Sequence, residues 1–245
     1  MEQENKQIFD FDLKMIADFF RELDRQGPGG VEQTLRALEF VPDRPGMRIA
    51  DIGCGTGGQT VTIARNRDCT ITAVDLLPEL LEEFRARIKK AGLENRVTAI
   101  QGSMDALPFS PGEFDVIWAE GSIYNIGFER GLREWRQYLK PGGIIAGTAV
   151  FISDYFPDID SPSGKVRILE EAGYAPLAHF ALPEHCWTEN YFAHASARIP
   201  GFLKQYGHSE KALLLAEMQK NEIAHYEKYK AYYGYVFYIG QKPEE

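Results

Sequence analysis

A glycine-rich loop between an apolar strand and a helix is the feature that most constrains this chain. Residues 47–60 read MRIADIGCGTGGQT, with glycines at 53, 55, 57 and 58. Glycines allow the backbone to turn sharply and to approach a ligand closely, and the first N–H groups of the following helix have no partner within it. The succession of strand, glycine loop and helix therefore predicts a ligand site at the carboxyl end of a parallel strand.

Predicted strands and helices alternate along the rest of the chain. Short apolar runs predict strands, and apolar residues at helical spacing predict helices. We expect strands at 47–52, 70–75, 96–101, 114–119, 143–150 and 235–240, and helices at 9–23, 31–40, 58–66, 79–91, 128–139 and 209–233. This alternation predicts an α/β fold with a mostly parallel sheet covered by helices on both faces.

The composition excludes several classes of protein. The 27 Lys and Arg residues against 36 Asp and Glu give a net charge of −9, so the chain lacks the positive field that nucleic acids or anionic lipids attract. No apolar run approaches the roughly 20 residues that span a bilayer, and the polar N-terminus resembles neither a signal nor a transit peptide. Three scattered cysteines suit a reducing compartment. We expect a cytoplasmic protein whose partner is a small molecule.

The spacing of the glycines alone fits two kinds of cofactor. Gly53, Gly55 and Gly58 form the GxGxxG pattern of dinucleotide sites. Asp51 precedes this loop, where a pyrophosphate gains nothing from a negative charge but the cationic S-adenosylmethionine does. Asp75 ends the next predicted strand and can accept bonds from both ribose hydroxyls with either cofactor, or cap the helix that follows.

Five blocks, in their order along the chain, resemble class I S-adenosylmethionine-dependent methyltransferases. They read DIGCGTG, AVD, GSMDALPF, FDVIWAE and LKPGG, within about 47–150. They are similar to the small-molecule branch related to ubiquinone and menaquinone biosynthesis methyltransferases. RQGPG, EGSIYNIGFERG and LPEHCWT resemble methyltransferases of anaerobic bacteria and archaea whose substrates we cannot name.

The resemblance implies a Rossmann-like sheet of seven strands with an antiparallel last strand. It also implies one methyltransferase domain over 1–245. Within that domain we expect an N-terminal helical cap at 1–46, a cofactor-binding core at 47–150, and a substrate cap with the last strands at 151–245. The stretch from Phe151 to Pro162, where such proteins cover the active site, looks shorter than in its apparent relatives.

The resemblance further implies contacts with S-adenosyl-L-methionine. The glycine loop surrounds the methionine part and the ribose, supported by Asp51, and an Asp that commonly contacts adenine is replaced by Ser103, with Asp105 as an alternative acceptor. Cys54 is a small loop residue, because methyl transfer needs no protein nucleophile. The expected cofactor-binding residues are Arg25, Gln26, Asp51, Gly53, Cys54, Gly55, Gly57, Asp75, Leu76, Ser103, Met104 and Glu120. For Arg25 and Gln26, a plain helix end at GPGG is the alternative.

Aromatic residues crowd the chain beyond residue 150. Tyr124, Trp187 and Tyr191 are candidates to line a substrate pocket, although each also fits a core position. Glu222 falls within the apolar stripe of the long predicted helix, where it either extends to water or serves as a pocket acid. The same aromatic region is also compatible with a homodimer contact.

These observations lead to methyl transfer from S-adenosylmethionine to an unidentified small molecule by in-line displacement. A general base is optional, with Glu120, Tyr124, Glu222 or a histidine as candidates. The five histidines show no metal-binding spacing, so no metal is expected. The alternatives are an NAD-dependent oxidoreductase and a non-catalytic nucleoside-binding sensor on the same fold.

Overall fold

The computed structural model describes residues 12–152 and 161–244. Two features of the sequence analysis therefore lie partly outside it. Phe9 belongs to the first predicted helix, and residues 153–160 make up most of the stretch that looks shorter than in relatives. All helices, strands and contacts given below lie within residues 12–152 and 161–244.

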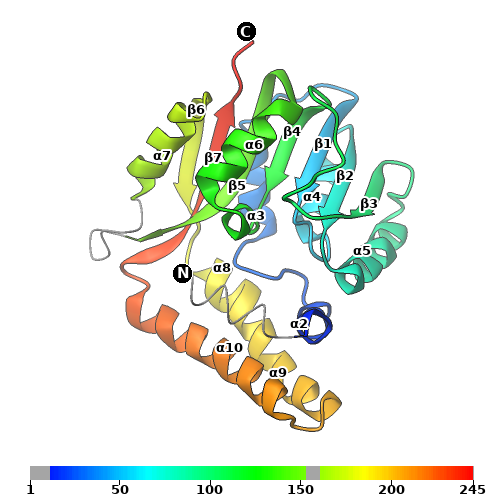
Figure 1. Ribbon diagram of the computed structural model, residues 1–245, viewed down its shortest axis with the longest axis vertical. Helices are drawn as coiled ribbons and strands as arrows, with labels where there is room; N and C mark the ends of the chain where they lie inside the picture. Colours follow the sequence, from blue (N-terminus) through cyan, green and yellow to red (C-terminus); the bar gives the residue numbers. More distant parts are fainter. Residues whose placement is uncertain (1–11, 153–160, 245) are drawn as a thin grey trace.

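One mixed sheet forms the centre of the described structure (Figure 1). Its seven strands lie in the order β3-β2-β1-β4-β5-β7-β6, and β7 runs antiparallel to both of its neighbours. The strands are β1 (Met47–Ile52), β2 (Cys69–Asp75), β3 (Val97–Gln101), β4 (Phe114–Ala119), β5 (Leu139–Ile152), β6 (Ala175–Ala181) and β7 (Tyr233–Gln241). The predicted α/β fold, its mostly parallel sheet and its antiparallel last strand are confirmed.

Helices cover both faces of this sheet and bury two apolar cores against it. They are α2 (Leu13–Phe20), α3 (Val31–Leu38), α4 (Gly58–Asn66), α5 (Pro78–Ala91), α6 (Phe128–Trp135), α7 (Pro162–Glu171), α8 (His185–Trp187), α9 (Ala193–Gln205) and α10 (Glu210–Tyr229). Three short segments join them: η1 (Ile123–Asn125), η2 (Arg136–Tyr138) and the π-helical η3 (Thr188–Phe192). The helices α2, α8, α9 and α10 gather at the end of the sheet where the parallel strands terminate (Figure 1).

Local sequence signals account for several of these boundaries. The side chain of Asp12 accepts a bond from the N–H of Lys14 and caps α2, so this helix begins at Leu13. The helix α5 begins with Pro78 and ends at Gly92, whose φ of 67° is left-handed. These are the caps that the sequence pattern favours, and the neighbouring strands and helices have nearly the predicted bounds.

The long C-terminal helix is shorter than predicted. It ends at Tyr229, and Tyr233 begins β7 instead of completing the helical stripe. The reason is tertiary: β7 pairs with β5 on one side and β6 on the other, so its residues are almost wholly buried between two strands. Aromatic spacing suited a helix as well as a strand, and the sheet decided between them.

Candidate functional site

The glycine loop after β1 has the conformation that its sequence requires. Gly53, Gly55 and Gly57 have φ values of 75°, 54° and 84°, in the left-handed region that residues with a Cβ rarely adopt. The N–H groups of Gly53 and Cys54 both donate to the carbonyl of Val74, at 2.8 and 3.0 Å. The loop is therefore folded back against the end of β2.

Asp75 ends β2 directly beside this loop. One carboxylate oxygen accepts from the N–H of Gly55 at 2.8 Å, and the other accepts from the N–H of Leu77 at 3.0 Å. Each carboxylate oxygen can accept more than one bond, so both keep room for a ligand hydroxyl. Burial raises the pKa of Asp75 although these backbone bonds oppose the shift. The first residue of α5 is Pro78 and its N-cap position is Leu77, so Asp75 is not the cap of that helix.

Asp51 lies inside the protein, under the loop. Its carboxylate accepts from the hydroxyl of Thr60 at 2.5 Å and from the amide of Gln59 at 3.2 Å, which links β1 to the first turn of α4. Burial raises the pKa of Asp51 to about 7. Asp51 is fully buried, and its hydrogen bonds hold the strand and the helix that flank the loop.

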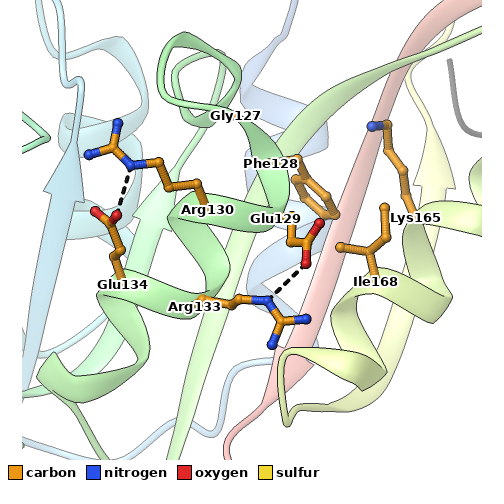
Figure 2. Close-up of a pocket in the computed structure, with 8 residues that line it drawn as sticks. All are labelled: Gly127, Phe128, Glu129, Arg130, Arg133, Glu134, Lys165 and Ile168. Atoms are coloured by element: carbon orange, nitrogen blue, oxygen red, sulfur yellow. Dashed lines mark hydrogen bonds and ion pairs between the residues drawn. The ribbon is translucent and has the colours of Figure 1, made fainter. Parts of the chain in front are cut away.

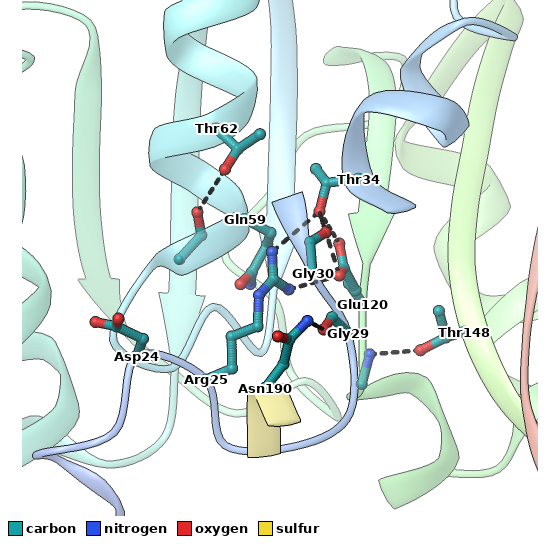
Figure 3. Close-up of polar contacts among 12 residues, drawn as sticks. Asp24, Arg25, Gly29, Gly30, Thr34, Gln59, Thr62, Glu120, Thr148 and Asn190 are labelled. Carbon is teal, nitrogen blue, oxygen red and sulfur yellow. Dashed lines mark hydrogen bonds and ion pairs between the residues drawn. The ribbon is translucent and has the colours of Figure 1, made fainter. Parts of the chain in front are cut away.

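Arg25 and Glu120, which the sequence analysis treated separately, form one buried ion pair (Figure 3). Arg25 Nη1 lies 2.6 Å from Glu120 Oε1, and the side chains are 11% and 2% exposed. Glu120 Oε2 also accepts from the Thr34 hydroxyl at 2.9 Å and from Trp118 Nε1 at 3.1 Å. The Glu120 carboxylate is thus surrounded by donors from three separate parts of the chain, and no local pattern in the sequence predicted this pairing.

Gln26 holds the chain segment after α2 against the glycine loop. Its side-chain oxygen accepts from the N–H of Thr56 at 3.1 Å, and its side-chain nitrogen donates to the Thr56 hydroxyl at 3.0 Å. On the other side, Asn190 of η3 donates to the carbonyl of Gly29 at 2.7 Å. We call residues 24–30 the strap, because they connect the glycine loop, through Gln26, to η3, through Gly29.

The remaining expected cofactor residues border the same edge of the sheet. Leu76 is 50% exposed and Met104 is half-buried, so both offer apolar surface near Asp75. Ser103 interacts locally, its hydroxyl accepting from the N–H of Asp105 at 3.2 Å. The carboxylate of Asp105 in turn lies 2.7 Å from Arg130. Cys54 is buried and burial raises the pKa of its thiol well above its ordinary value, which makes it a poor nucleophile.

The three predicted pocket residues converge in one aromatic cluster, which we define as Tyr124, Trp187, Tyr191, Tyr233 and Tyr235. The Trp187 ring packs edge-on against Tyr233 and Tyr235, with ring centroids 5.7 and 5.0 Å away. Tyr124 lies 6.1 Å from Tyr235 by the same measure. Trp187 and Tyr191 are buried, whereas 42% of the surface of Tyr124 is exposed.

Glu222 of α10 faces this cluster. Its carboxylate lies 3.4 Å from the Tyr191 hydroxyl, which donates to it, and the same hydroxyl lies 3.5 Å from Gln219. Burial raises the pKa of Glu222 to about 7. Of the two alternatives for this residue, the structure favours a half-buried acid beside aromatic rings over a side chain extended into water.

Two surface hollows lie elsewhere. One, between α6 and α7, is bordered by Phe128 and Lys165 and by charged residues that pair along α6, Glu129 with Arg133 at 2.9 Å and Arg130 with Glu134 at 2.7 Å (Figure 2). The other lies between the strap and the outer sides of α4 and α5. Neither is lined by Gly53, Asp75 or Glu222, so neither is the site that the loop predicts.

The described residues contain no group of three or more His, Cys, Asp and Glu side chains arranged to hold a metal ion. Within the same ranges, no helix combines the length and the apolar character needed to cross a bilayer.

Comparison with known proteins agrees with this fold. A family model described as a methyltransferase domain matches residues 49–143. The 27-O-demethylrifamycin SV methyltransferase of Amycolatopsis mediterranei is 28% identical over 156 residues, which are 62% of this chain and 55% of that protein. The chain spans between about a third and just over half of the length of the first curated relatives it matches.

Solved structures resemble nearly the whole chain. The crystal structure of a S-adenosylmethionine-dependent methyltransferase from Geobacter sulfurreducens, in complex with S-adenosyl-L-homocysteine, has a TM-score of 0.82 at 18% identity and covers 93% of this chain and 97% of its own. The [4+2]-cyclase SpnF has a TM-score of 0.75 at 23% identity, covering 91% and 86%. At these identities the structures establish the fold, and their names include two different activities. The comparisons do not specifically support the quinone-biosynthesis branch.

Proposed function

We propose that this chain, which belongs to the class I S-adenosylmethionine-dependent methyltransferases, binds S-adenosylmethionine at the glycine loop and transfers its methyl group to a small molecule. The observation that carries the proposal is the juxtaposition of three left-handed glycines with the carboxylate of Asp75 at the end of β2. The matched methyltransferase domain contains both, since it covers residues 49–143.

The side chains at this edge fit the parts of the cofactor. Asp75 retains acceptor capacity on both carboxylate oxygens, which suits the two ribose hydroxyls. Leu76, half exposed, and Met104, half-buried, offer apolar surface for the adenine. The loop itself presents backbone without Cβ atoms at Gly53, Gly55 and Gly57. The methyltransferase from Geobacter sulfurreducens, similar in fold, has S-adenosyl-L-homocysteine bound.

The chemistry asks little of the protein beyond binding and orientation. S-adenosylmethionine supplies an activated methyl group on a sulfonium, which leaves as a neutral thioether when the acceptor attacks in line. This chain then has to bind the acceptor opposite the sulfonium and exclude water. Gln26 fixes the strap to the loop, and the Arg25–Glu120 pair fixes the strap to the end of β4. Arg25 and Gln26 are thereby proposed as positioning residues next to the methionine end.

Titration calorimetry with S-adenosylmethionine and S-adenosylhomocysteine tests this function. Wild-type protein should bind both, and Asp75→Ala should weaken binding at least about tenfold, because hydrogen bonds to a charged group contribute about 1.5–3 kcal/mol. Asp43→Ala is the matched control and should bind as wild type does, because this exposed aspartate precedes β1, at the opposite end of that strand from the glycine loop. Folded wild-type protein that binds neither ligand would rule out the proposal, and saturable binding of NAD instead would favour the oxidoreductase.

Four finer statements belong to the same proposal: the class of acceptor, the compartment, the domain organisation and the oligomeric state. The acceptor is a small molecule, in keeping with a net charge of −9 that disfavours nucleic acid. The protein acts in the cytoplasm as one domain, with 1–46 and 151–245 covering a core at 47–150. Light scattering tests whether the aromatic C-terminal region also supports a homodimer.

A further inference from the structure

The aromatic cluster lies at the edge of the sheet where a methyl acceptor has to arrive. Because β7 is antiparallel, its first residues lie beside the end of β5: Tyr235 pairs with Val150 and Tyr233 with Ile152. Tyr124 follows β4 within η1, and Tyr191 comes from η3. Side chains from three parts of the chain therefore meet Glu222 at the carboxyl end of the parallel strands.

A short contact joins this cluster to the glycine loop. Ser122, two residues before Tyr124, donates from its hydroxyl to the carbonyl of Ile52 at 2.5 Å. A Cβ added to Gly53 would lie 2.3 Å from the Cβ of Ser122, so the segment leading to Tyr124 packs directly on the loop. The loop, where the proposed function places the methionine part, and the cluster are thus neighbours.

The Glu222 carboxylate is sparsely partnered. Among the described residues, it accepts a hydrogen bond from the hydroxyl of Tyr191, and at 3.4 Å that bond is long. The titratable groups facing it are the hydroxyls of Tyr191 from η3, of Tyr124 from η1, and of Tyr233 and Tyr235 from β7. Burial raises the pKa of each of these hydroxyls, so they are neutral near pH 7.

Among the described residues, no positively charged side chain shifts the pKa of Glu222. Burial and the Tyr191 hydroxyl are what shift the pKa of Glu222, and no Lys or Arg in the described ranges contributes. A ligand carboxylate or phosphate here would face Glu222 without a counter-charge. Tyr124, a residue with 42% of its surface exposed, instead offers an aromatic side chain to a cation.

We propose that this cluster is the acceptor site and that it takes a small amine, protonated in solution, with Glu222 binding its ammonium group beside the ring of Tyr124. The inference rests on the proposed function, since it names the acceptor class of the same enzyme. The groups that would face the acceptor are one carboxylate, neutral tyrosine hydroxyls and the partly exposed side chain of Tyr124. They match an ammonium group better than a neutral or anionic one.

Glu222 also accepts the proton that the ammonium group has to lose before its nitrogen can be methylated. An ammonium nitrogen has no lone pair, so it first transfers one proton to the Glu222 carboxylate and becomes a neutral amine. The amine lone pair then forms the N–C bond as the S–C bond breaks and its electron pair stays on sulfur. The products are a methylammonium, neutral S-adenosylhomocysteine and a protonated Glu222, which releases its proton to water. A carboxyl with a pKa of about 7 can accept and release that proton near neutral pH.

Binding of three matched fragments tests this inference without turnover. With S-adenosylhomocysteine saturating, calorimetry compares benzylamine, benzyl alcohol and benzoate at pH 8. We expect saturable binding of benzylamine, at least about tenfold tighter than of the other two. Glu222→Gln, which keeps the shape and the contact with Tyr191, should weaken benzylamine at least about tenfold and leave the affinity for S-adenosylhomocysteine within twofold. Glu217→Gln, an exposed acid on the same helix, should change neither.

Each outcome bears on one of the two proposals. Normal binding of S-adenosylhomocysteine with no preference for benzylamine, or with a preference that survives Glu222→Gln, would overturn the amine site and leave the methyltransferase intact. Failure of wild-type protein to bind S-adenosylhomocysteine would overturn both. A panel of primary amines, assayed by mass spectrometry for N-methyl products, extends the test to turnover, and methylation confined to phenols or thiols would contradict it.

Discussion

The glycine loop and the aromatic cluster lie side by side but are built in opposite ways. The carboxylates at the loop bind residues close in sequence, Asp51 with Thr60 and Asp75 with Gly55. The cluster joins Tyr191 to Glu222, 31 residues apart, and Tyr124 to Tyr235 from a different part of the sheet. In the loop the carboxylates have several donors each, whereas the described part of the chain gives Glu222 one long bond.

This difference in construction fits the two different ligands that we propose for the loop and the cluster. A cofactor used in the same way by many proteins can be held by a compact motif, because the motif specifies backbone shape and strand end together. An acceptor site is shaped by loops and caps, where side chains vary and unused hydrogen-bonding capacity is left for the ligand. The strap, with Arg25 and Gln26, connects the two regions.

The ion pair that connects the strap to β4 should give the largest effect. Arg25→Ala leaves the buried Glu120 without its cation, so we expect the free energy of unfolding to fall by about 3–5 kcal/mol. Urea denaturation measures it. The double variant Arg25→Ala with Glu120→Gln should recover much of the loss, since no charge remains buried. A loss below about 1 kcal/mol for Arg25→Ala would mean that the two regions are stable without this connection.

Asp51 should make the loop region sensitive to pH. Its pKa is about 7 in the folded protein and 3.8 as the ordinary value, so the folded state holds a proton that the unfolded state loses between about pH 4 and pH 7. Raising the pH through this window therefore destabilises the folded protein. Asp51→Asn removes that dependence. Above about pH 7 the variant should be more stable than wild type by up to about 4 kcal/mol, because each pKa unit corresponds to about 1.4 kcal/mol.

The measurement is urea unfolding of both proteins at pH 5, 6, 7 and 8. The stability of Asp51→Asn relative to wild type should rise with pH and level off above about pH 7. A constant difference between the two proteins would show that Asp51 does not change protonation on folding. Asn also keeps an oxygen that can accept from Thr60, so the variant should retain the fold.

Gly57 tests whether the loop backbone is as constrained as its φ of 84° indicates. A Cβ there would lie 1.9 Å from a ring atom of Phe84, so Gly57→Ala combines left-handed strain with a clash. We expect a loss of about 3 kcal/mol, from about 1–2 for the conformation and a similar amount for overpacking. Gly112→Ala, with a φ of 64° and open space around it, should lose only the first part. Equal losses of unfolding free energy in Gly57→Ala and Gly112→Ala would show that the contact with Phe84 does not contribute.

Glu222→Gln should have the smallest effect on stability. The described residues give Glu222 one long hydrogen bond. At pH 4.5 its carboxyl is protonated in the folded protein and about half protonated in the unfolded chain, so thermal denaturation at that pH should change the free energy of unfolding by less than about 1 kcal/mol. A larger loss would make Glu222 a structural residue and weaken the distinction between the two regions.

The sequence by itself determined the edge of the sheet where we propose that the cofactor binds. The glycines at 53, 55 and 57, the strand before them and Asp75 after the next strand are encoded within about 30 residues, where hydrogen bonding and allowed φ values leave few alternatives. The bounds of β1, β4 and α4 followed from apolar periodicity for the same reason.

Only the tertiary structure decided how the aromatic cluster, the proposed acceptor site, is built. It moved Tyr233 from the predicted helix into β7, turned Glu222 toward Tyr191, and paired Arg25 with Glu120 across 95 positions of the chain. No local pattern encodes such contacts, because the energy of a buried charge or ring depends on which distant elements the sheet brings against it. The positions of Tyr124, Tyr191 and Glu222 were readable as candidates, but their convergence was not.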